Sequence, residues 1–410
     1  MGMQELCGMA ALLFVFGLGS VQAASATEGN PDREVVVQGN NAFALDLYAK
    51  LQTKPGNLFF CPYSIRTALT MTAAGASGNT AQQMAKVLHL KLEPRLHAAV
   101  QAWLNELSAE AGSPQGYQLR IANALWGQTG YAFKPEFQEL LKKYYGAGVQ
   151  EANFTKATEE ARKQINTWVA DQTQGKIAEL FKPGILMPGT VLVLANATYF
   201  KGKWALPFDA ANTAEAPFTL SGGEKVNAPM MHQSASVGYV EDDAVQVLEL
   251  PYQGGQLSML FLLPKKLDQL PALEAKFTVE YLQGYLMKLQ VQKVQVSLPK
   301  FTIQAEFSLP GVLKELGMTD AFALPPADFS GMTGKPEVSI SEVLHHAFVE
   351  VTEEGTEAAA ATAVTMTRGL SRPLSFQADH PFLFVIRDKR SNGLLFLGRV
   401  MDPRGAKGAK

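Results

Sequence analysis

No stretch of this 410-residue chain is rich enough in Pro, Gly or Ser to act as a linker, and no segment repeats. The chain therefore offers no obvious place to divide, although its length would also suit two or three domains of average size. Hydrophobic residues make up 47% of the sequence, which is enough for one substantial core. We predict one interwoven α+β domain.

Two periodicities alternate along the chain and support the α+β assignment. Apolar residues recur at helical spacing in residues 40–111, 158–174 and 309–316. The second of these helices should cover a sheet, because Ala161 and Ile165 share one face of it. Alternating or continuous apolar runs predict strands elsewhere. These runs lie at residues 117–126, 191–200, 245–263, 294–298, 338–351, 381–387 and 394–400.

The beginning of the chain predicts a secretory signal. Residues 8–18 are apolar, too few to span a membrane, and followed by small residues that suit a signal peptidase. We expect residues 1–23 to be removed and residues 24–410 to form one domain that is exported, to the cell exterior or a periplasm. A fraying terminus or a membrane anchor is the alternative.

Cys7 would leave with the signal, so Cys61 has no partner for a disulfide and is expected to be a buried small residue.

The sequence contains no catalytic or metal-binding motif, which is weak evidence against an enzyme because two carboxylates can meet from anywhere in a fold. It lacks HExxH, the GxSxG elbow and the Gly-rich phosphate loops. Glu342 and His345 match half of a di-iron motif in spacing, but the apolar alternation around them favours a strand.

The charge balance does not favour a nucleic-acid partner. Lys and Arg total 36 against 38 acidic residues, a net charge of −2.

Residues 353–368 have conflicting local preferences. Four consecutive alanines favour a helix, whereas Gly355 interrupts its start and the Thr and Val residues after 361 favour extended chain. The segment is therefore expected to be an exposed loop. In a strand, every second residue from Thr356 to Met366 would form a face without charge, and small side chains would fit between two existing strands. The composition thus suits both a loop and a central strand.

Several separated motifs, in the family's order, resemble those of the serpins. They extend over residues 36–403, nearly the whole expected mature length. The motifs are NLFFCPYSI (57–65), NATYFKGKW (196–204), ADFSGM (327–332), FQADHPFLFVI (376–386) and FLGRV (396–400). The hinge-like run is Glu353, Glu354, Gly355, Thr356 and Glu357, followed by Ala358, Ala359, Ala360 and Ala361. The chain is identified as a member of the inhibitory serpins.

The resemblance implies three sheets, about nine helices and an exposed reactive loop at about residues 355–376. Inhibitory serpins trap serine or sometimes cysteine proteases, which cut the loop and are carried along as an acyl-enzyme when the loop inserts into the main sheet. The implied partner is a target serine protease in a covalent complex with a monomer, without cofactor, nucleic acid or membrane. A non-inhibitory serpin, acting as carrier, storage protein or chaperone, is the alternative that the small uncharged hinge argues against.

The bond that the protease cuts is expected to be Arg368-Gly369, because Arg368 is the long basic residue that suits a trypsin-like pocket. The family's usual spacing from the hinge glycine selects Gly369-Leu370 instead, which suits an elastase-like protease. Met366 and Arg372 are lesser options.

Family correspondence also assigns a polar cluster to the place where strands of the main sheet part. Ser64, Asn196 and His345 would lie beneath the opening and Trp204 near its top. The simpler interpretation is satisfied hydrogen bonding in the core for the polar residues, and ordinary core packing for the tryptophan. Thr356 would be the first side chain to enter the sheet.

Overall fold

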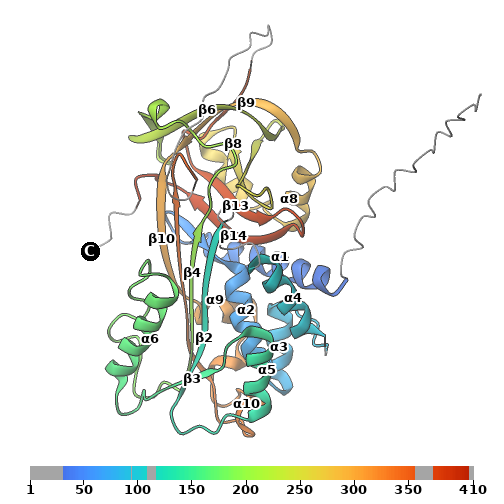
Figure 1. Cartoon of the computed structure of the whole chain (residues 1–410), viewed down its shortest axis with the longest axis vertical. Coiled ribbons are helices and arrows are strands. Elements are labelled where there is room, and N and C mark those ends of the chain that lie inside the picture. The colour runs from blue at the N-terminus through green and yellow to red at the C-terminus, as the bar shows by residue number, and fades with distance from the viewer. Residues whose placement is uncertain (1–30, 94, 109–116, 356–372, 406–410) are drawn as a thin grey trace, which may run out of the picture.

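The computed structural model describes residues 31–93, 95–108, 117–355 and 373–405 (Figure 1). Within them the α-helices are α1 (Pro31–Leu51), α2 (Pro62–Ala73), α3 (Gly78–Val87), α4 (Leu96–Ser108), α5 (Pro135–Tyr145), α6 (Thr158–Gln172), α7 (Leu270–Glu274), α8 (Val279–Leu286), α9 (Pro310–Leu316) and α10 (Ser330–Thr333). The strands are β1 (Leu58–Phe60), β2 (Gln118–Gln128), β3 (Val149–Ala152), β4 (Leu192–Lys201), β5 (Ala214–Thr219), β6 (Lys225–Glu241), β7 (Val245–Pro251), β8 (Leu257–Pro264), β9 (Gln290–Pro299), β10 (Phe301–Ser308), β11 (Ile340–Val351), β12 (Leu374–Gln377), β13 (Phe382–Asp388) and β14 (Gly393–Val400).

A five-stranded sheet runs along the length of the molecule, in the order β10-β11-β4-β2-β3 (Figure 1). Its central pair, β4 and β11, is parallel, whereas β10 and β2 run antiparallel to the strands they flank. β4 is buried at every residue except its last, Lys201, which is typical of a strand that is covered on both faces.

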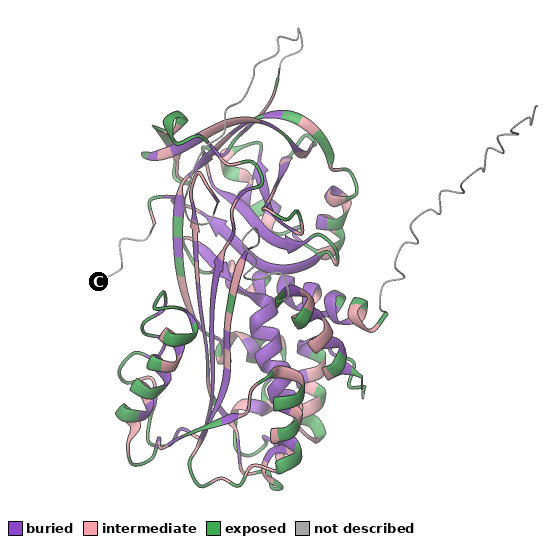
Figure 2. Cartoon of the chain, viewed as in Figure 1, coloured by how far each residue is buried: buried purple, intermediate pink, exposed green. Residues whose placement is uncertain are grey.

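Helices cover the two faces of this sheet differently. On one face α6 packs Ala161, Ile165 and Val169 against Trp126 and Ala195 in a small separate core (Figure 1). On the other face lies α2, which is buried on all sides and forms part of the main core (Figure 2). The covering helix that the periodicity predicts is therefore confirmed at α6.

A nine-stranded sheet forms the other part of the molecule, in the order β1-β14-β13-β8-β7-β6-β9-β12, with β5 also paired to β6. β8, β13 and β14 are buried along their whole length and supply much of the main core (Figure 2). β12 lies at the end of the order and pairs in parallel with β9 through residues 374–377. It is the strand through which the chain returns after residues 356–372.

The predicted α+β serpin fold is confirmed, with two differences in detail. The resemblance implied three sheets, but the described strands form two, because the 17-residue β6 pairs with β5, β7 and β9 and joins them in one sheet. The described residues contain ten α-helices where about nine were expected. The segment predicted as helical over residues 40–111 also includes β1, whose three residues are too few for a periodicity to show.

Candidate functional site

The seam between β4 and β11 is the central feature of the five-stranded sheet. The two strands pair in parallel from Leu192 and Ile340 to Tyr199 and Phe348. Both strands continue beyond this last pair without pairing to each other. Parallel pairing is slightly less stable per residue than antiparallel pairing. By this measure the seam is weaker than the two antiparallel joints that flank it, and it ends before its two strands do.

A row of three polar side chains crosses the seam. Asn123 of β2, Asn196 of β4 and His345 of β11 occupy directly opposite positions in neighbouring strands. Asn196 donates to Asn123 Oδ1 and to Ser64 Oγ of α2, the latter at 2.6 Å, and its own Oδ1 contacts the His345 ring. The backbone N–H of Cys61 donates to His345 Nε2 at 3.0 Å. The row thus ties three strands to the beginning of α2.

The His345 ring is held neutral. Because Nε2 accepts a backbone N–H, the single proton of the neutral ring lies on Nδ1, which donates to Asn196 Oδ1. Burial, with a smaller contribution from neighbouring His346, lowers the pKa of His345 from 6.5 to about 3. Protonation would place an uncompensated charge inside the seam.

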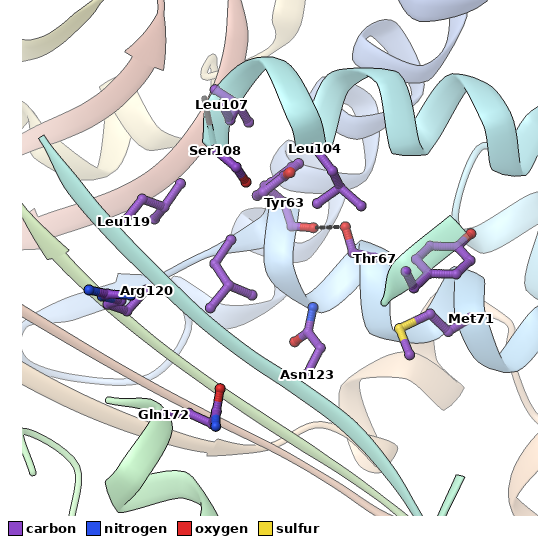
Figure 3. Close-up of a pocket in the computed structure, with 12 residues that line it drawn as sticks. Tyr63, Thr67, Met71, Leu104, Leu107, Ser108, Leu119, Arg120, Asn123 and Gln172 are labelled. Carbon is purple, nitrogen blue, oxygen red and sulfur yellow. Dashed lines mark hydrogen bonds between the residues drawn. The ribbon is translucent and has the colours of Figure 1, made fainter. Parts of the chain in front are cut away.

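A cavity of about 270 Å³ lies beside this row, between α2, α4 and β2 (Figure 3). Figure 3 shows Leu104 and Leu107 of α4 on one side of it and Asn123 on another, so Asn123 belongs to both the row and the cavity wall. Packing contacts are missing where a cavity separates two elements. β2 therefore lacks packing contacts with α4 at this place.

Residues 352–355, which we call the hinge base, follow β11 directly and lie against the chain that follows β4. Trp204 donates from its backbone N–H to Glu354 O at 2.8 Å and from its indole Nε1 to Thr352 O at 3.1 Å. The indole stacks on the ring of Tyr252, with centroids 4.7 Å apart. These bonds join the extensions of β4 and β11 at the level where strand pairing has stopped.

Glu353 ties the hinge base to two further elements. Its carboxylate pairs with Lys300 at 2.8 Å and accepts a bond from Thr213 Oγ1 at 2.8 Å. Its carbonyl accepts the backbone N–H of Phe208 at 2.7 Å. Burial alone would raise the pKa of Glu353, but Lys300 and the hydrogen bonds hold it below the ordinary value. The carboxylate is therefore charged when the hinge base is in place.

Gly355 approaches the chain after β4 too closely for a side chain. It forms a bridge with Lys203 and has a φ of 129°. A Cβ at this position would lie 2.1 Å from Gly202 O and 2.7 Å from Trp204 N. Glycine adopts such a backbone conformation without steric cost. The hinge base therefore depends on a glycine at this position.

The structure brings together the three residues predicted to form the polar cluster, because Asn196 bonds to both Ser64 and His345. Trp204, predicted near the top of the opening, makes its hydrogen bonds at the hinge base. Sequence reasoning missed Asn123. This residue joins the row because it lies opposite Asn196 in the pairing of β2 with β4, and the sequence does not reveal that register.

The predicted hinge and reactive bond are described only in part. Glu353 and Gly355 belong to the hinge base. The remaining predicted residues lie outside the described residues; they are Thr356, Glu357, Ala358, Ala359, Ala360, Ala361, Arg368, Gly369 and Leu370.

Other kinds of site find little support in the described part of the chain. There, no group of three or more His, Cys, Asp or Glu side chains is arranged to hold a metal ion. No helix there is both long and apolar enough to cross a membrane. Cys61 is buried as expected, and burial raises the pKa of its thiol to about 12, which disfavours the reactive thiolate. The seam and the hinge base are therefore the candidate site.

The variant His345→Gln should be less sensitive to acid than the wild type. The native pKa of His345 is about 3, so between this value and the ordinary 6.5 the unfolded chain binds more protons than the native one. The free energy of unfolding then falls as the pH drops through this window, by about 1 kcal/mol per pH unit from this group. Urea unfolding at about pH 7 and about pH 5.5 should show the smaller fall in the variant. An equal fall in both proteins would contradict a buried neutral His345.

The variant Gly355→Ala should detach the hinge base and lose about 3 kcal/mol of stability, from backbone strain and broken hydrogen bonds. Gly223→Ala is the matched control, because Gly223 has a φ of 84° but nothing within 4 Å of an added Cβ. This control should lose only about 1 kcal/mol. Urea unfolding followed by tryptophan fluorescence measures both. Equal losses would show that the close contact at Gly355 is unimportant.

Comparison with known proteins places this geometry in a family. The family model described as serpin (serine protease inhibitor) matches residues 38–403. The chain is 44% identical to serpin B8 of Bos taurus and 42% identical to the leukocyte elastase inhibitor of Homo sapiens, each over 90% of this chain and 100% of the relative. The structure of an Arabidopsis serpin in its native stressed conformation has a TM-score of 0.82 at 32% identity, covering 90% of this chain and 98% of that one.

The expectation that the protein is secreted is wrong. Serpin B8, serpin B6 and the leukocyte elastase inhibitors are intracellular serpins of the B group, which contradicts an extracellular or periplasmic location. The apolar run that suggested export lies in residues 1–23, outside the described residues. The prediction relied on the apolar run alone. A secretory signal begins with positively charged residues, whereas residues 1–6 contain Glu5 and neither Lys nor Arg.

The family match spans both the seam and the hinge base, and the two relatives are matched over their whole length. The order of the five-stranded sheet, the mixed α+β architecture and the motifs in the sequence agree with it. This chain belongs to the serpin family of protease inhibitors.

Proposed function

We propose that this serpin is a suicide-substrate inhibitor of serine proteases whose cut loop enters the seam between β4 and β11 as an added strand. The supporting observation is the geometry where the seam ends. Strand pairing stops at Tyr199 and Phe348, and the hinge base, from which residues 356–372 continue, is bonded to that same end. Insertion of the reactive loop into a sheet is a known property of serpins. The loop thus begins at the place it would enter.

The chemistry of this reaction belongs to the protease, so the serpin is not an enzyme. The protease's serine hydroxyl adds to a loop carbonyl, the peptide bond to the next residue breaks, and the leaving amine takes the proton that the protease histidine removed from the serine. An ester then links the loop to the protease. Because the cut loop is free at one end, its insertion moves the attached protease before water hydrolyses the ester. The product is a covalent complex with one serpin monomer.

The gain in hydrogen bonding is large enough to drive this step. A new central strand of about 12 to 15 residues, at about 1 kcal/mol net per bond, releases on the order of 10 kcal/mol. Disordering an oxyanion hole and triad slows deacylation by several powers of ten. The free energy released by the new strand is enough to distort the protease active site to that extent. It must also cover the parting of Asn196 from His345, the one bond of the polar row that crosses the seam.

The proposed target is a trypsin-like protease, because Arg368 offers a basic side chain to its specificity pocket. An elastase-like target is the second candidate, since relatives at 42% identity are named leukocyte elastase inhibitors and since the hinge spacing selects Gly369-Leu370. Incubation with trypsin and with pancreatic elastase, followed by a denaturing gel and sequencing of the released C-terminal peptide, separates the two. A peptide beginning at Gly369 supports the first and one beginning at Leu370 the second. No stable complex with either protease would overturn the proposed inhibition.

The variant Arg368→Ala should lower the rate of trypsin inhibition by at least about 100-fold, because the protease pocket loses the charge that it recognises. Arg372→Ala is the matched control, and it should inhibit like the wild type. Complex formation with trypsin, measured over time on denaturing gels, gives both rates. Unchanged inhibition by Arg368→Ala would remove Arg368 from this role.

The variant Thr356→Arg should be cut by the protease without trapping it, because a charge would have to be buried when the loop begins to insert. Glu357→Arg is the matched control, since residue 357 would lie on the opposite face, where the native residue is already charged. The measurement is the ratio of cleaved serpin to covalent complex. Covalent complexes of Thr356→Arg in wild-type amounts would refute the hinge assignment.

A further inference from the structure

His380 lies in the short turn that joins β12 to β13, on the far side of the reactive loop from the hinge base. Its ring contacts an acceptor at each nitrogen. Nδ1 lies 2.8 Å from Asp379 Oδ1, and Nε2 lies 2.7 Å from the carbonyl oxygen of Pro264, the last residue of β8. The His380 side chain is only 14% exposed.

These two contacts constrain the protonation of the ring. A carboxylate and a backbone carbonyl have no proton to give, so each contact is a hydrogen bond only when the facing nitrogen carries a proton. The neutral ring has one such proton and can satisfy Asp379 or Pro264, but not both. The imidazolium satisfies both. The geometry therefore selects the charged ring, and loss of its proton breaks one of two bonds.

The other groups around the ring do not replace this interaction. β8 continues into Lys265, which lines a shallow surface pocket together with Asp379 and His380. The Lys265 ammonium is paired with Glu241 at 2.8 Å. β7 contributes the neutral Gln246, whose amide donates to Ser375 O of β12 at 2.9 Å. Asp379 is thus the acidic group that faces the ring. It is also held in place, because its carbonyl accepts the backbone N–H of Thr219 at 2.7 Å.

We propose that His380 is a pH-sensitive anchor of β12. When protonated, its ring bonds at the same time to Pro264 of β8 and to Asp379 of its own turn, and when neutral it keeps only one of these two bonds. β12 depends on such an anchor because it is a terminal strand of four residues that pairs with β9 alone. Beyond β12, the backbone N–H of Ala378 bonds to Ser297 O at 2.9 Å, next to the proposed anchor.

The sign of the effect follows from the contacts. Although burial opposes it, the bonds to Asp379 and Pro264 raise the pKa of His380 above 6.5. A group whose pKa is raised in the native state contributes its stability below the unfolded value and loses it as the pH rises through the native value. β12 is therefore held most firmly in mildly acid solution and less firmly in alkaline solution.

The anchor has a consequence that rests on the proposed function. An uncut loop is tied to the body at both ends, so it can fill the seam only if β12 leaves β9. Loosening β12 should therefore speed the spontaneous loss of inhibitory activity at alkaline pH, without any protease.

The primary test is amide hydrogen exchange of residues 374–377 at about pH 6 and about pH 9, expressed as protection factors that correct for the intrinsic pH dependence. In the wild type, protection of β12 should fall about tenfold at the higher pH, as expected for one charge-assisted bond. In His380→Gln the amide can still donate to Pro264 O but does not titrate, so protection should be equal at both values. His232→Gln, a histidine variant in β6, which is separated from β12 by β9, is the matched control and should behave as the wild type.

A titration of the wild-type His380 ring by nuclear magnetic resonance gives an independent test that needs no variant. Its pKa should lie above the ordinary value, and Asp379→Asn should lower it. A pKa at or below the ordinary value, or a pH dependence of β12 protection that persists in His380→Gln, would overturn the anchor. Both measurements are independent of inhibition. A serpin that forms no protease complex, but whose β12 follows these expectations, would thus overturn the proposed function and leave the anchor standing.

Discussion

The closed seam between β4 and β11 is the constraint on which the rest of the molecule depends, because on the proposed mechanism the same seam must later part. A purely apolar pair of strands would be joined by backbone hydrogen bonds and side-chain packing alone. In this chain the polar row crosses the seam instead, and Asn196 links His345 of one strand to Ser64 of the helix beneath. Hydrogen bonds are short and directional. The bond between Asn196 and His345 therefore holds the closed register, and it is lost once the two strands part.

The hinge base completes the seam where strand pairing ends. Above Tyr199 and Phe348 the two strands no longer bond to each other, and the bonds of Trp204 to Thr352 and Glu354 take over the task of joining their extensions. On the proposed mechanism the loop inserts from this end, so the entering strand would part the hinge-base bonds first and the bond between Asn196 and His345 afterwards.

The parts of the fold that local patterns determine were predictable, and the parts that depend on register were not. The helical spacing of Ala161, Ile165 and Val169 predicts α6, and the apolar run of β4 predicts a buried strand. Asn123 joins the row only because β2 pairs with β4 in one register, which non-local contacts select. Family correspondence gave Trp204 an approximate place, near the top of the sheet, but not its partners. The number of sheets depended on the length of β6, which propensity does not fix.

The two ends of the reactive loop are attached by different physical means, and this difference separates the cut chain from the uncut one. The hinge base lies at the end of the seam, so a strand that formed there would part the bonds between the hinge base and Trp204 without moving the chain far. β12 is joined through four paired residues, the buried ring of Phe376 and the His380 contacts, all of them outside the five-stranded sheet that contains the seam. While the loop is intact, insertion along its whole length requires these contacts to break. After a cut they can stay in place, because the hinge side alone moves. On the proposed mechanism, the stability of β12 would therefore set how strongly insertion depends on cleavage, because a weakly held β12 would let the intact loop insert without a protease.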